Sequence, residues 1–295
     1  MNQIGTEQLR IGTRSSRLAC AQAELLKQYL ESRHPHLRVS LVKMKTEGDR
    51  ILDKKLDEIG GKGLFVKELD AALAQGRTDL SVHSLKDMPF EENADYPILG
   101  YSKREIPFDA LVLRQGFARI DLNQPIGTSS PRRSVQLPNI YPGCQIKSVR
   151  GNILTRLEKL DRGEYGALVL AAAGLVRLGL ENRISRLFPA SEMIPAPGQG
   201  ILAVQGRRDF DKSLLEDFFD ENAKWQALAE RSFVRALGGG CASPAAAYAE
   251  VNGDEMILMG LVPCEGGAVK TVSRKGKKWE AVRLGAESAN ACKIS

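Results

Sequence analysis

A lysine and a carboxylate stand side by side at the end of an apolar segment, where they could bind a substrate and donate or accept a proton. Residues 79–89 begin as an expected strand, which is followed by Lys86 and Asp87. Met88-Pro89 ends the regular structure, because proline cannot donate to a β-ladder and restricts the residue before it. Open α/β sheets place their chemistry at the carboxyl edges of strands. From spacing alone, however, a solvated strand end explains this pair better.

A cysteine far along the chain shifts that interpretation toward catalysis. Cys241 follows three glycines at 238–240, and Ser243-Pro244 comes shortly after it. Glycine takes positive φ without strain, so such a loop can hold the sulfur out of the core. The alternative is an inert buried thiol, the usual state of a lone cysteine, but the flanking residues favour a loop.

Three expected strand-to-helix turns carry hydroxyls or an amide together with arginines. They lie at residues 14–16, 126–133 and 149–156. Backbone N–H groups at a helix N-terminus, hydroxyls and guanidinium groups together bind anions. Any one turn could be an ordinary cap, but the three together predict a cleft lined for a small ligand with several phosphates or carboxylates.

The charge of the chain is concentrated in one segment. The whole chain carries +6, and residues 132–186 alone contain ten Lys or Arg against four Asp or Glu, again +6. Eight of the ten are arginines, which suit bidentate binding of carboxylate or phosphate. A basic solvated face and a nucleic-acid surface are the alternatives. Aromatic residues make up only 6% of the chain, so few side chains are there to stack on bases.

Several other classes are disfavoured by the sequence. Residues 60–63 lack the Walker A pattern, and no G-x-G-x-x-G occurs. The five cysteines have irregular spacings that suggest neither a disulfide framework nor a zinc site, so we expect no metal. The longest uncharged apolar run, 166–176, is too short to span a bilayer, and the first twenty residues contain no apolar signal region. We expect a cytoplasmic protein without membrane or nucleic-acid partners.

Strands and helices alternate to about residue 220, which predicts an α/β fold. Expected strands cover 9–13, 38–44, 79–82, 110–113, 126–127, 146–149, 167–170 and 201–205, the last returning to the first domain. Helices are expected at 15–33 and 64–75 and after residues 130 and 152. The long polar segment 46–63, between the strand at 38–44 and the helix at 64–75, predicts a lid. After a helix at 222–237, strands at 248–251, 256–262 and 268–273 predict an antiparallel meander, closed by a helix from about 279.

These motifs together resemble the porphobilinogen deaminase (hydroxymethylbilane synthase) family. The matching blocks run in family order along nearly the whole chain, at 11–16, 60–69, 82–89, 127–133, 150–152, 197–200 and 239–241. The resemblance implies two periplasmic-binding-protein-like α/β domains and a small C-terminal α+β domain. The implied boundaries are 1–105 with 200–221 for domain 1, 106–199 for domain 2 and 222–295 for domain 3.

The resemblance also implies an activity. Such an enzyme joins four molecules of porphobilinogen head to tail, releases ammonia at each step, and yields hydroxymethylbilane for tetrapyrrole biosynthesis. Its primer, a dipyrromethane cofactor, is held by a thioether to the residue matching Cys241, and the carboxylate matching Asp87 is the central catalytic group. A monomer is expected. Binding of the cofactor and substrate is implied for Arg14, Ser16, Gln22, Lys62, Phe65, Lys86, Thr128, Ser129, Ser130, Arg132, Arg133, Arg150, Arg156, Arg177 and Gln199.

The physical chemistry of the chain agrees with this activity. Each pyrrole brings two carboxylates, so a growing chain needs many guanidinium groups, and the basic segment supplies them. Loss of ammonia leaves a cation, which a nearby carboxylate such as Asp87 would stabilise. A solute-binding protein of the same two-lobed architecture, closing on an anionic ligand without chemistry, is the competing hypothesis.

Overall fold

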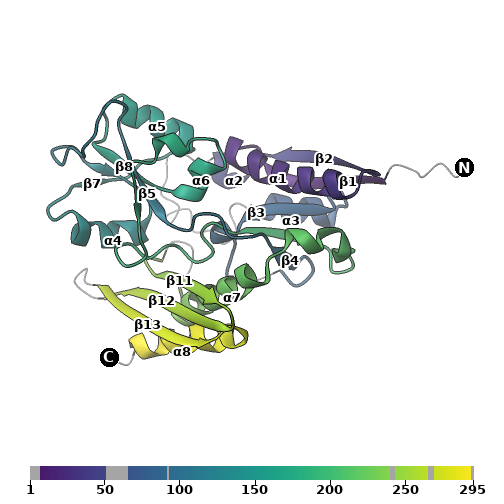
Figure 1. Cartoon of the computed structure of the whole chain (residues 1–295). Helices are drawn as coiled ribbons and strands as arrows, with labels where there is room; N and C mark the ends of the chain where they lie inside the picture. The colour runs from purple at the N-terminus through teal and green to yellow at the C-terminus, as the bar shows by residue number, and fades with distance from the viewer. Residues whose placement is uncertain (1–6, 51–65, 92, 240–242, 265–268, 294–295) are drawn as a thin grey trace, which may run out of the picture. The chain divides into compact units, whose positions relative to one another are not determined.

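The chain is a mixed α/β protein, as the sequence predicts. The computed structural model describes residues 7–50, 66–91, 93–239, 243–264 and 269–293 (Figure 1). The chain divides into two compact units, residues 1–104 with 201–224 and residues 105–200 with 225–295. Since the second unit contains two separate sheets, the division into three domains stays a prediction.

The first unit is built on a five-stranded sheet of order β2-β1-β3-β10-β4. Strand β1 pairs in parallel with β2 and β3, whereas β10 runs antiparallel to β3 and β4. Helix α1 packs on this sheet because Ala23, Leu26 and Leu30 share one apolar face that meets Ile11 and Leu80. Its elements are β1 (Glu7–Arg14), α1 (Arg17–Arg33), β2 (Leu37–Met44), α2 (Glu47–Arg50), α3 (Lys67–Ala74), β3 (Leu80–Ser84), η1 (Leu85–Asp87), β4 (Ile98–Tyr101), β10 (Leu202–Gly206) and η3 (Lys212–Phe218).

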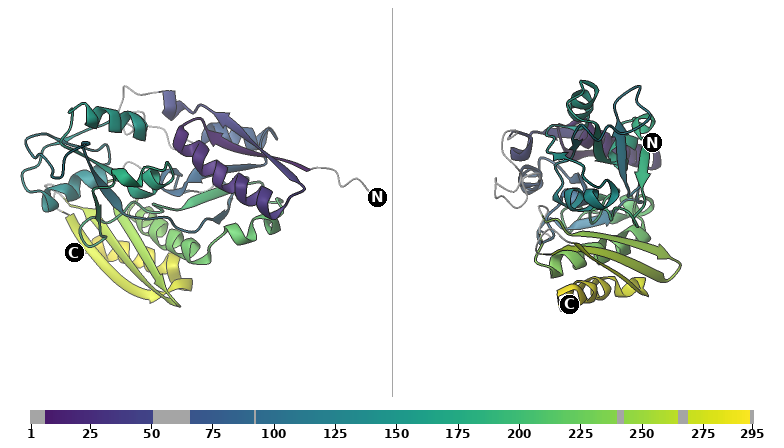
Figure 2. Two further views of the ribbon diagram at one scale, coloured as in Figure 1. Left: turned by 45° about the horizontal axis from the view of Figure 1, so that its top comes forward. Right: turned by 90° about the vertical axis from the view of Figure 1, so that its left-hand side faces the viewer.

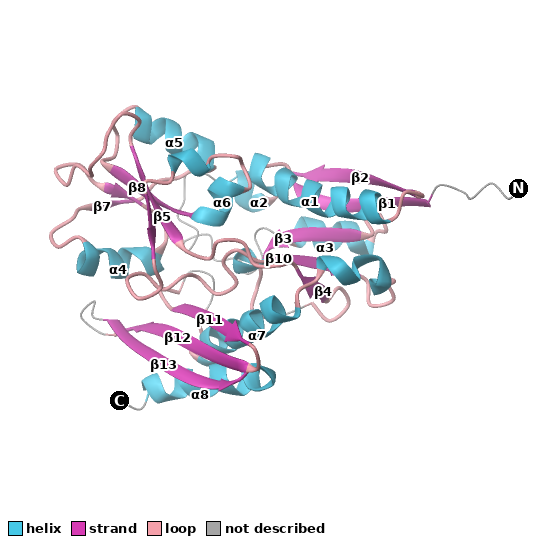
Figure 3. Ribbon diagram, viewed as in Figure 1, coloured by secondary structure: helices cyan, strands magenta, loops and turns pink. Residues whose placement is uncertain are grey.

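The second unit begins with another five-stranded sheet, of order β7-β6-β8-β5-β9. Strand β8 is apolar throughout, and β5 is apolar after its first residue, Asp109, because both faces of the sheet are covered. Val112 and Leu168 face one core, and Leu111 and Val169 face the other. Its elements, coloured by type in Figure 3, are β5 (Asp109–Leu113), β6 (Ile126–Gly127), α4 (Pro131–Ile140), β7 (Ile146–Lys147), α5 (Ile153–Asp161), β8 (Ala167–Ala171), α6 (Ala172–Val176), η2 (Glu181–Arg183) and β9 (Arg186–Phe188).

The second unit ends in the antiparallel sheet β11-β12-β13, with helix α8 along one face (Figure 2). Helix α7 packs there too, where the Phe233 ring covers Gly260 so closely that no Cβ would fit. Tyr248 and Leu261 face the other way and pack against Ile194 of the preceding segment. The elements are α7 (Glu221–Ala236), β11 (Ala246–Asn252), β12 (Glu255–Pro263), β13 (Val269–Lys277), η5 (Lys278–Glu280) and α8 (Ala281–Lys293).

Several boundaries differ from those expected. Strand β13 extends to Lys277, four residues beyond the predicted end, and β7 is only two residues long. Strands β4 and β9, of four and three residues, were not expected from the sequence. The expected lid begins with helix α2, and its remainder lies outside the described residues. Within the described ranges, no helix is long and apolar enough to cross a bilayer.

Candidate functional site

Lys86 and Asp87 lie at the carboxyl edge of the first sheet, where the sequence pattern placed them. They form η1 directly after β3, with both side chains half-buried, and the N–H of Met88 closes the turn on Leu85 O at 3.1 Å. Because β1 and β3 pair in parallel, Arg14 at the end of β1 lies on the same edge. A cation and a carboxylate therefore follow β3 beside the arginine that ends β1.

Helix α1 contributes two of the predicted binding residues to this edge. Ser16 is its N-cap, and the Ser16 Oγ accepts from the N–H of Ala19 at 3.3 Å. Gln22 is 3% exposed and donates from Nε2 to Ser84 Oγ at 2.8 Å. This side-chain bond ties the helix to the residue immediately before η1.

His83 lies four residues before Asp87 and is buried. Its Nε2 is 2.9 Å from Gln205 Oε1 on β10. Burial lowers the pKa of His83 to about 4; the hydrogen bond with Gln205 opposes that shift and the charge of Arg14 adds to it. The imidazole is therefore neutral at physiological pH, and His83 is a buried, hydrogen-bonded residue of the core.

Two of the anion-binding turns expected from the sequence are neighbours in the second unit. Ser129, after β6, donates from Oγ to Val149 O at 2.6 Å and accepts from Val149 N–H at 3.1 Å. Ser130 is the N-cap residue of α4, and Asn152 is that of α5. Thr128 is 2% exposed, and its Oγ1 accepts from the N–H of Ser130 at 3.3 Å. The β6–α4 and β7–α5 turns thus present their hydroxyls and helix N-termini together.

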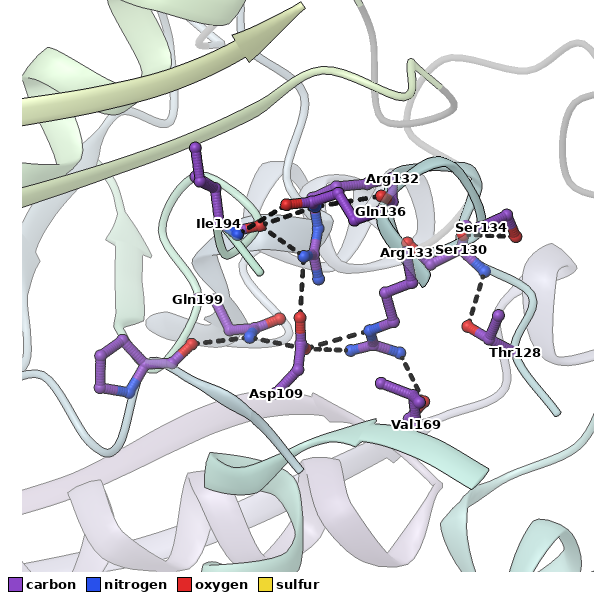
Figure 4. A network of polar contacts seen from close by, with 11 residues as sticks. Asp109, Thr128, Ser130, Arg132, Arg133, Ser134, Gln136, Val169, Ile194 and Gln199 are labelled. Atoms are coloured by element: carbon purple, nitrogen blue, oxygen red, sulfur yellow. Dashed lines mark hydrogen bonds and ion pairs between the residues drawn. The ribbon is translucent and has the colours of Figure 1, made fainter. Parts of the chain in front are cut away.

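Asp109 holds two of the predicted binding arginines in the interior (Figure 4). Its side chain is fully buried, and those of Arg132 and Arg133 are 4% and 8% exposed. Arg133 donates from Nε and Nη2 to Asp109 Oδ1 at 3.0 and 2.7 Å, and Arg132 Nη1 lies 2.8 Å from Oδ2. Gln199 Nε2 donates to the same Oδ1 at 3.0 Å and to Pro107 O at 2.7 Å. One carboxylate therefore joins α4 to the segment that contains Gln199.

The ionisation of this cluster follows from its burial and charge. Burial alone would raise the pKa of Asp109, but the charges and hydrogen bonds of Arg132 and Arg133 outweigh it and hold the pKa well below its usual value. Burial lowers the pKa of Arg132, opposed by the charge of Asp109, and the guanidinium still remains protonated at neutral pH. The cluster therefore carries one negative and two positive charges away from water.

The remaining predicted arginines lie at turns of the second unit. Arg156 is half-buried in the first turn of α5 and donates from Nε to Gly151 O at 2.8 Å, and Arg150 is half-buried just before that helix. Arg177 caps the C-terminus of α6 and donates to Gly200 O. Burial lowers the pKa of Arg177 to about 10, against the opposing charge of Glu105.

The structure thus groups the predicted residues within each unit. The first unit collects Arg14, Ser16, Gln22, Lys86 and Asp87, and the second collects Thr128, Ser129, Ser130, Arg132, Arg133, Arg150, Arg156, Arg177 and Gln199. Lys62, Phe65 and Cys241 lie outside the described residues. Sequence reasoning missed Asp109, although a lone carboxylate opening an otherwise apolar strand is a signal, because such a residue is buried only when it is paired.

Two α/β sheets whose strand-to-helix turns carry arginines and hydroxyls make this an α/β protein with turns suited to anions. Comparisons with known proteins show its family. Residues 9–215 match the family model described as porphobilinogen deaminase, dipyromethane cofactor binding domain. Residues 225–293 match the model described as porphobilinogen deaminase, C-terminal domain. The chain belongs to the porphobilinogen deaminase family, and it is an enzyme of tetrapyrrole biosynthesis.

Curated relatives named porphobilinogen deaminase match almost the full length. The protein of Acetivibrio thermocellus is 50% identical over 277 residues, covering 94% of this chain and 95% of the relative. That of Alkaliphilus oremlandii is 50% identical over 274 residues, with 92% and 93% covered. That of Bordetella parapertussis is 44% identical over 289 residues, with 96% and 92% covered.

Solved structures show more distant likeness. The BenM effector binding domain with its effector benzoate has a TM-score of 0.42 at 16% identity, with 72% of this chain and 88% of that chain covered. The methionine binding protein MetQ has a TM-score of 0.43 at 13% identity, with the same shares covered. The fold assignment rests on the strand orders and the family match.

Proposed function

We propose that this enzyme joins four porphobilinogen molecules head to tail and that Asp87 is its catalytic carboxylate. The observation that carries the proposal is the position of Asp87 in η1, at the carboxyl edge of the first sheet and next to Lys86. Asp87 would protonate the departing amine, which leaves as ammonia, and then stabilise the cationic carbon that remains. Lys86 and Arg14 would bind the acetate and propionate groups of the substrate, because both are cations on the same edge.

The residues of the second unit suit a cofactor that carries several carboxylates. Arg132 Nε is buried and has no hydrogen-bond partner among the described residues, which leaves a donor for an anionic group. We propose that the arginines and hydroxyls of the β6–α4 and β7–α5 turns hold the dipyrromethane, and that Cys241 attaches it through a thioether. When bound, this group supplies the pyrrole end to which the first substrate is joined.

Cofactor attachment is tested by intact mass. The wild-type chain should carry an adduct of two pyrrole units, and Cys241→Ala should lack it. The matched controls are alanine variants of the other four cysteines, Cys20, Cys144, Cys264 and Cys292, which should all keep the adduct. An active wild-type enzyme without the adduct would contradict the proposal.

The role of Asp87 is tested by single-turnover kinetics on enzyme already loaded with cofactor, so that assembly defects are not mistaken for catalytic ones. Asp87→Asn keeps the shape of the side chain but removes its charge and proton, so turnover should fall about 10²–10⁴-fold. Asp87→Glu should retain part of the activity. Asp79→Asn, immediately before the N-terminal end of β3, is the control and should turn over within a few-fold of wild type. Equal turnover by loaded Asp87→Asn would reject the assignment.

The same proposal includes the setting of the enzyme. We propose a cytoplasmic monomer whose three domains have the boundaries expected from the sequence. Its substrate is a small soluble molecule, which requires neither a membrane nor a nucleic acid. Light scattering of the purified chain should give the mass of one copy, about 32.3 kDa, and a dimer mass would contradict the monomer.

A further inference from the structure

Glu230, in the middle of α7, is a buried carboxylate to which the proposed chemistry gives no role. It is fully buried, and each of its oxygens accepts a hydrogen bond from a different backbone segment. Oε2 accepts from the N–H of Gly198 at 2.6 Å, and Oε1 accepts from the N–H of Ala249 at 2.7 Å. A buried carboxylate that accepts hydrogen bonds from backbone N–H groups fixes the position of those groups.

The first of these segments leads to the arginine cluster. Gly198 precedes Gln199, whose amide binds Asp109 and Pro107 O, and Asp109 in turn binds Arg133. Gly198 has φ +73°, so it takes its turn conformation without the strain that a side chain would add. A shift of Gly198 would therefore reach the arginines through Gln199 and Asp109.

The second connection leads to the cysteine. Helix α7 continues from Glu230 to Ala236, and its end is closed by bonds from Gly238 N–H to Arg235 O and from Gly239 N–H to Val234 O. Cys241 follows two residues later in the sequence. On the far side, β11 is held both by Glu230 at Ala249 and by the bond from Ala247 N–H to Pro195 O.

The chemistry of the site requires a carboxylate. Two N–H groups point at one side chain, so both of its terminal atoms must be acceptors. Glutamine offers one acceptor and one donor, and the donor would face an N–H. Aspartate keeps both acceptors but is shorter by one methylene, so it reaches only one of the two amides in full.

We propose that Glu230 is a positioning residue for cofactor assembly: it fixes the helix that leads to Cys241 relative to the segment that positions Gln199, Asp109 and the arginines. The proposal rests on the proposed function, since it assumes that Cys241 receives the cofactor and that the arginines bind it. A purely structural role would lower stability without slowing attachment in the folded protein.

The test compares Glu230→Gln with two controls in the full chain. Glu250→Gln makes the same substitution at an exposed position on β11, one residue from Ala249. Phe233→Leu lowers stability on the same helix without touching either amide, because Phe233 packs on Gly260. All variants are prepared without cofactor, mixed with porphobilinogen well below their thermal midpoints, and followed by intact mass, with hydrogen exchange measured at Gly198 and Ala249.

We expect Glu230→Gln to speed exchange at both amides about ten- to a hundredfold and to slow attachment about tenfold. Glu250→Gln should match wild type, and Phe233→Leu should lower the midpoint while attaching the cofactor at the wild-type rate. If Glu230→Gln does not fold, Glu230→Asp replaces it and should give an intermediate slowing.

An attachment rate like that of wild type in the Glu230 variant, or equal slowing in Phe233→Leu, would overturn the proposal. A wild-type chain that takes up no pyrrole units would instead contradict the proposed function, so the two failures are distinguishable.

Discussion

Asp109→Asn is the substitution that best tests how the second unit is held together. The carboxylate is fully buried at the first residue of β5, between two arginines that are themselves almost fully buried. Asparagine has nearly the same shape, so the strand pairing of Ala110 and Leu111 with β8 and β9 stays intact. What changes is the charge, because both guanidinium groups then remain in the interior without a counter-ion.

The expected loss is large for one substitution. Removing one partner of a buried ion pair costs about 3–5 kcal/mol, since an uncompensated charge stays away from water. The three donor contacts to Oδ1, from Arg133 and Gln199, weaken as well, although they act through the same charge and do not add in full. Against a typical total of about 5–15 kcal/mol, we expect the variant to lose roughly 3–5 kcal/mol of unfolding free energy.

Urea unfolding followed by tryptophan fluorescence measures this loss directly, because both tryptophans, Trp225 and Trp279, lie in the second unit. The control is Glu192→Gln, which breaks the pair between Glu192 and Arg186; both of these side chains are more than a third exposed, so at most about 1 kcal/mol should be lost. A loss under about 1 kcal/mol in Asp109→Asn would refute the reasoning.

Acidity gives a second check on Asp109→Asn. The folded-state pKa of Asp109 lies below the unfolded value. Its contribution to stability is therefore fully present above about pH 4 and is lost as the pH falls through the folded pKa. The difference between wild type and variant should stay constant above pH 4 and narrow below it. A difference that does not narrow in acid would show that the charge is not its source.

Two further predictions concern other buried positions. The pKa of His83 is near 4 in the folded state and near 6.5 in the unfolded state, so its contribution to the free energy of unfolding is present above pH 6.5 and falls by about 3 kcal/mol toward pH 4. His83→Gln should therefore make the free energy of unfolding less dependent on pH between 6.5 and 4. A pH profile of urea midpoints equal to that of wild type would contradict this prediction. Gly285→Ala would place a Cβ 2.3 Å from Ala229 O, so α7 and α8 must separate and the thermal midpoint should fall by several degrees, whereas Gly253→Ala, at an open turn, tests only the cost of positive φ.

The sequence predicted the elements of the sheets because their periodicity is local. The turns after β6 and β7 were expected to converge, since parallel strands bring their carboxyl ends to one edge, and the bond from Ser129 to Val149 O shows that they do. The same logic placed Asp87 after β3. Strands β4 (Ile-Leu-Gly-Tyr) and β9 (Arg-Leu-Phe) were not predicted, because neither sequence alternates between polar and apolar residues.

The burial of Arg132 and Arg133 could not be predicted from the sequence. The net charge of a segment counts only its own carboxylates and does not show a partner that lies elsewhere in the chain. Their partner, Asp109, lies more than twenty residues earlier and outside the basic segment. Within the segment, Arg183 pairs with Asp161 across 22 residues, at 2.8 Å. Part of the segment's +6 charge is thus neutralised by Asp109, a partner from outside the segment that only the fold brings near. If Arg132 and Arg133 bind the cofactor as proposed, their guanidinium groups must also be held in place, and the buried carboxylate of Asp109 that holds both is then as necessary to the site as the arginines themselves.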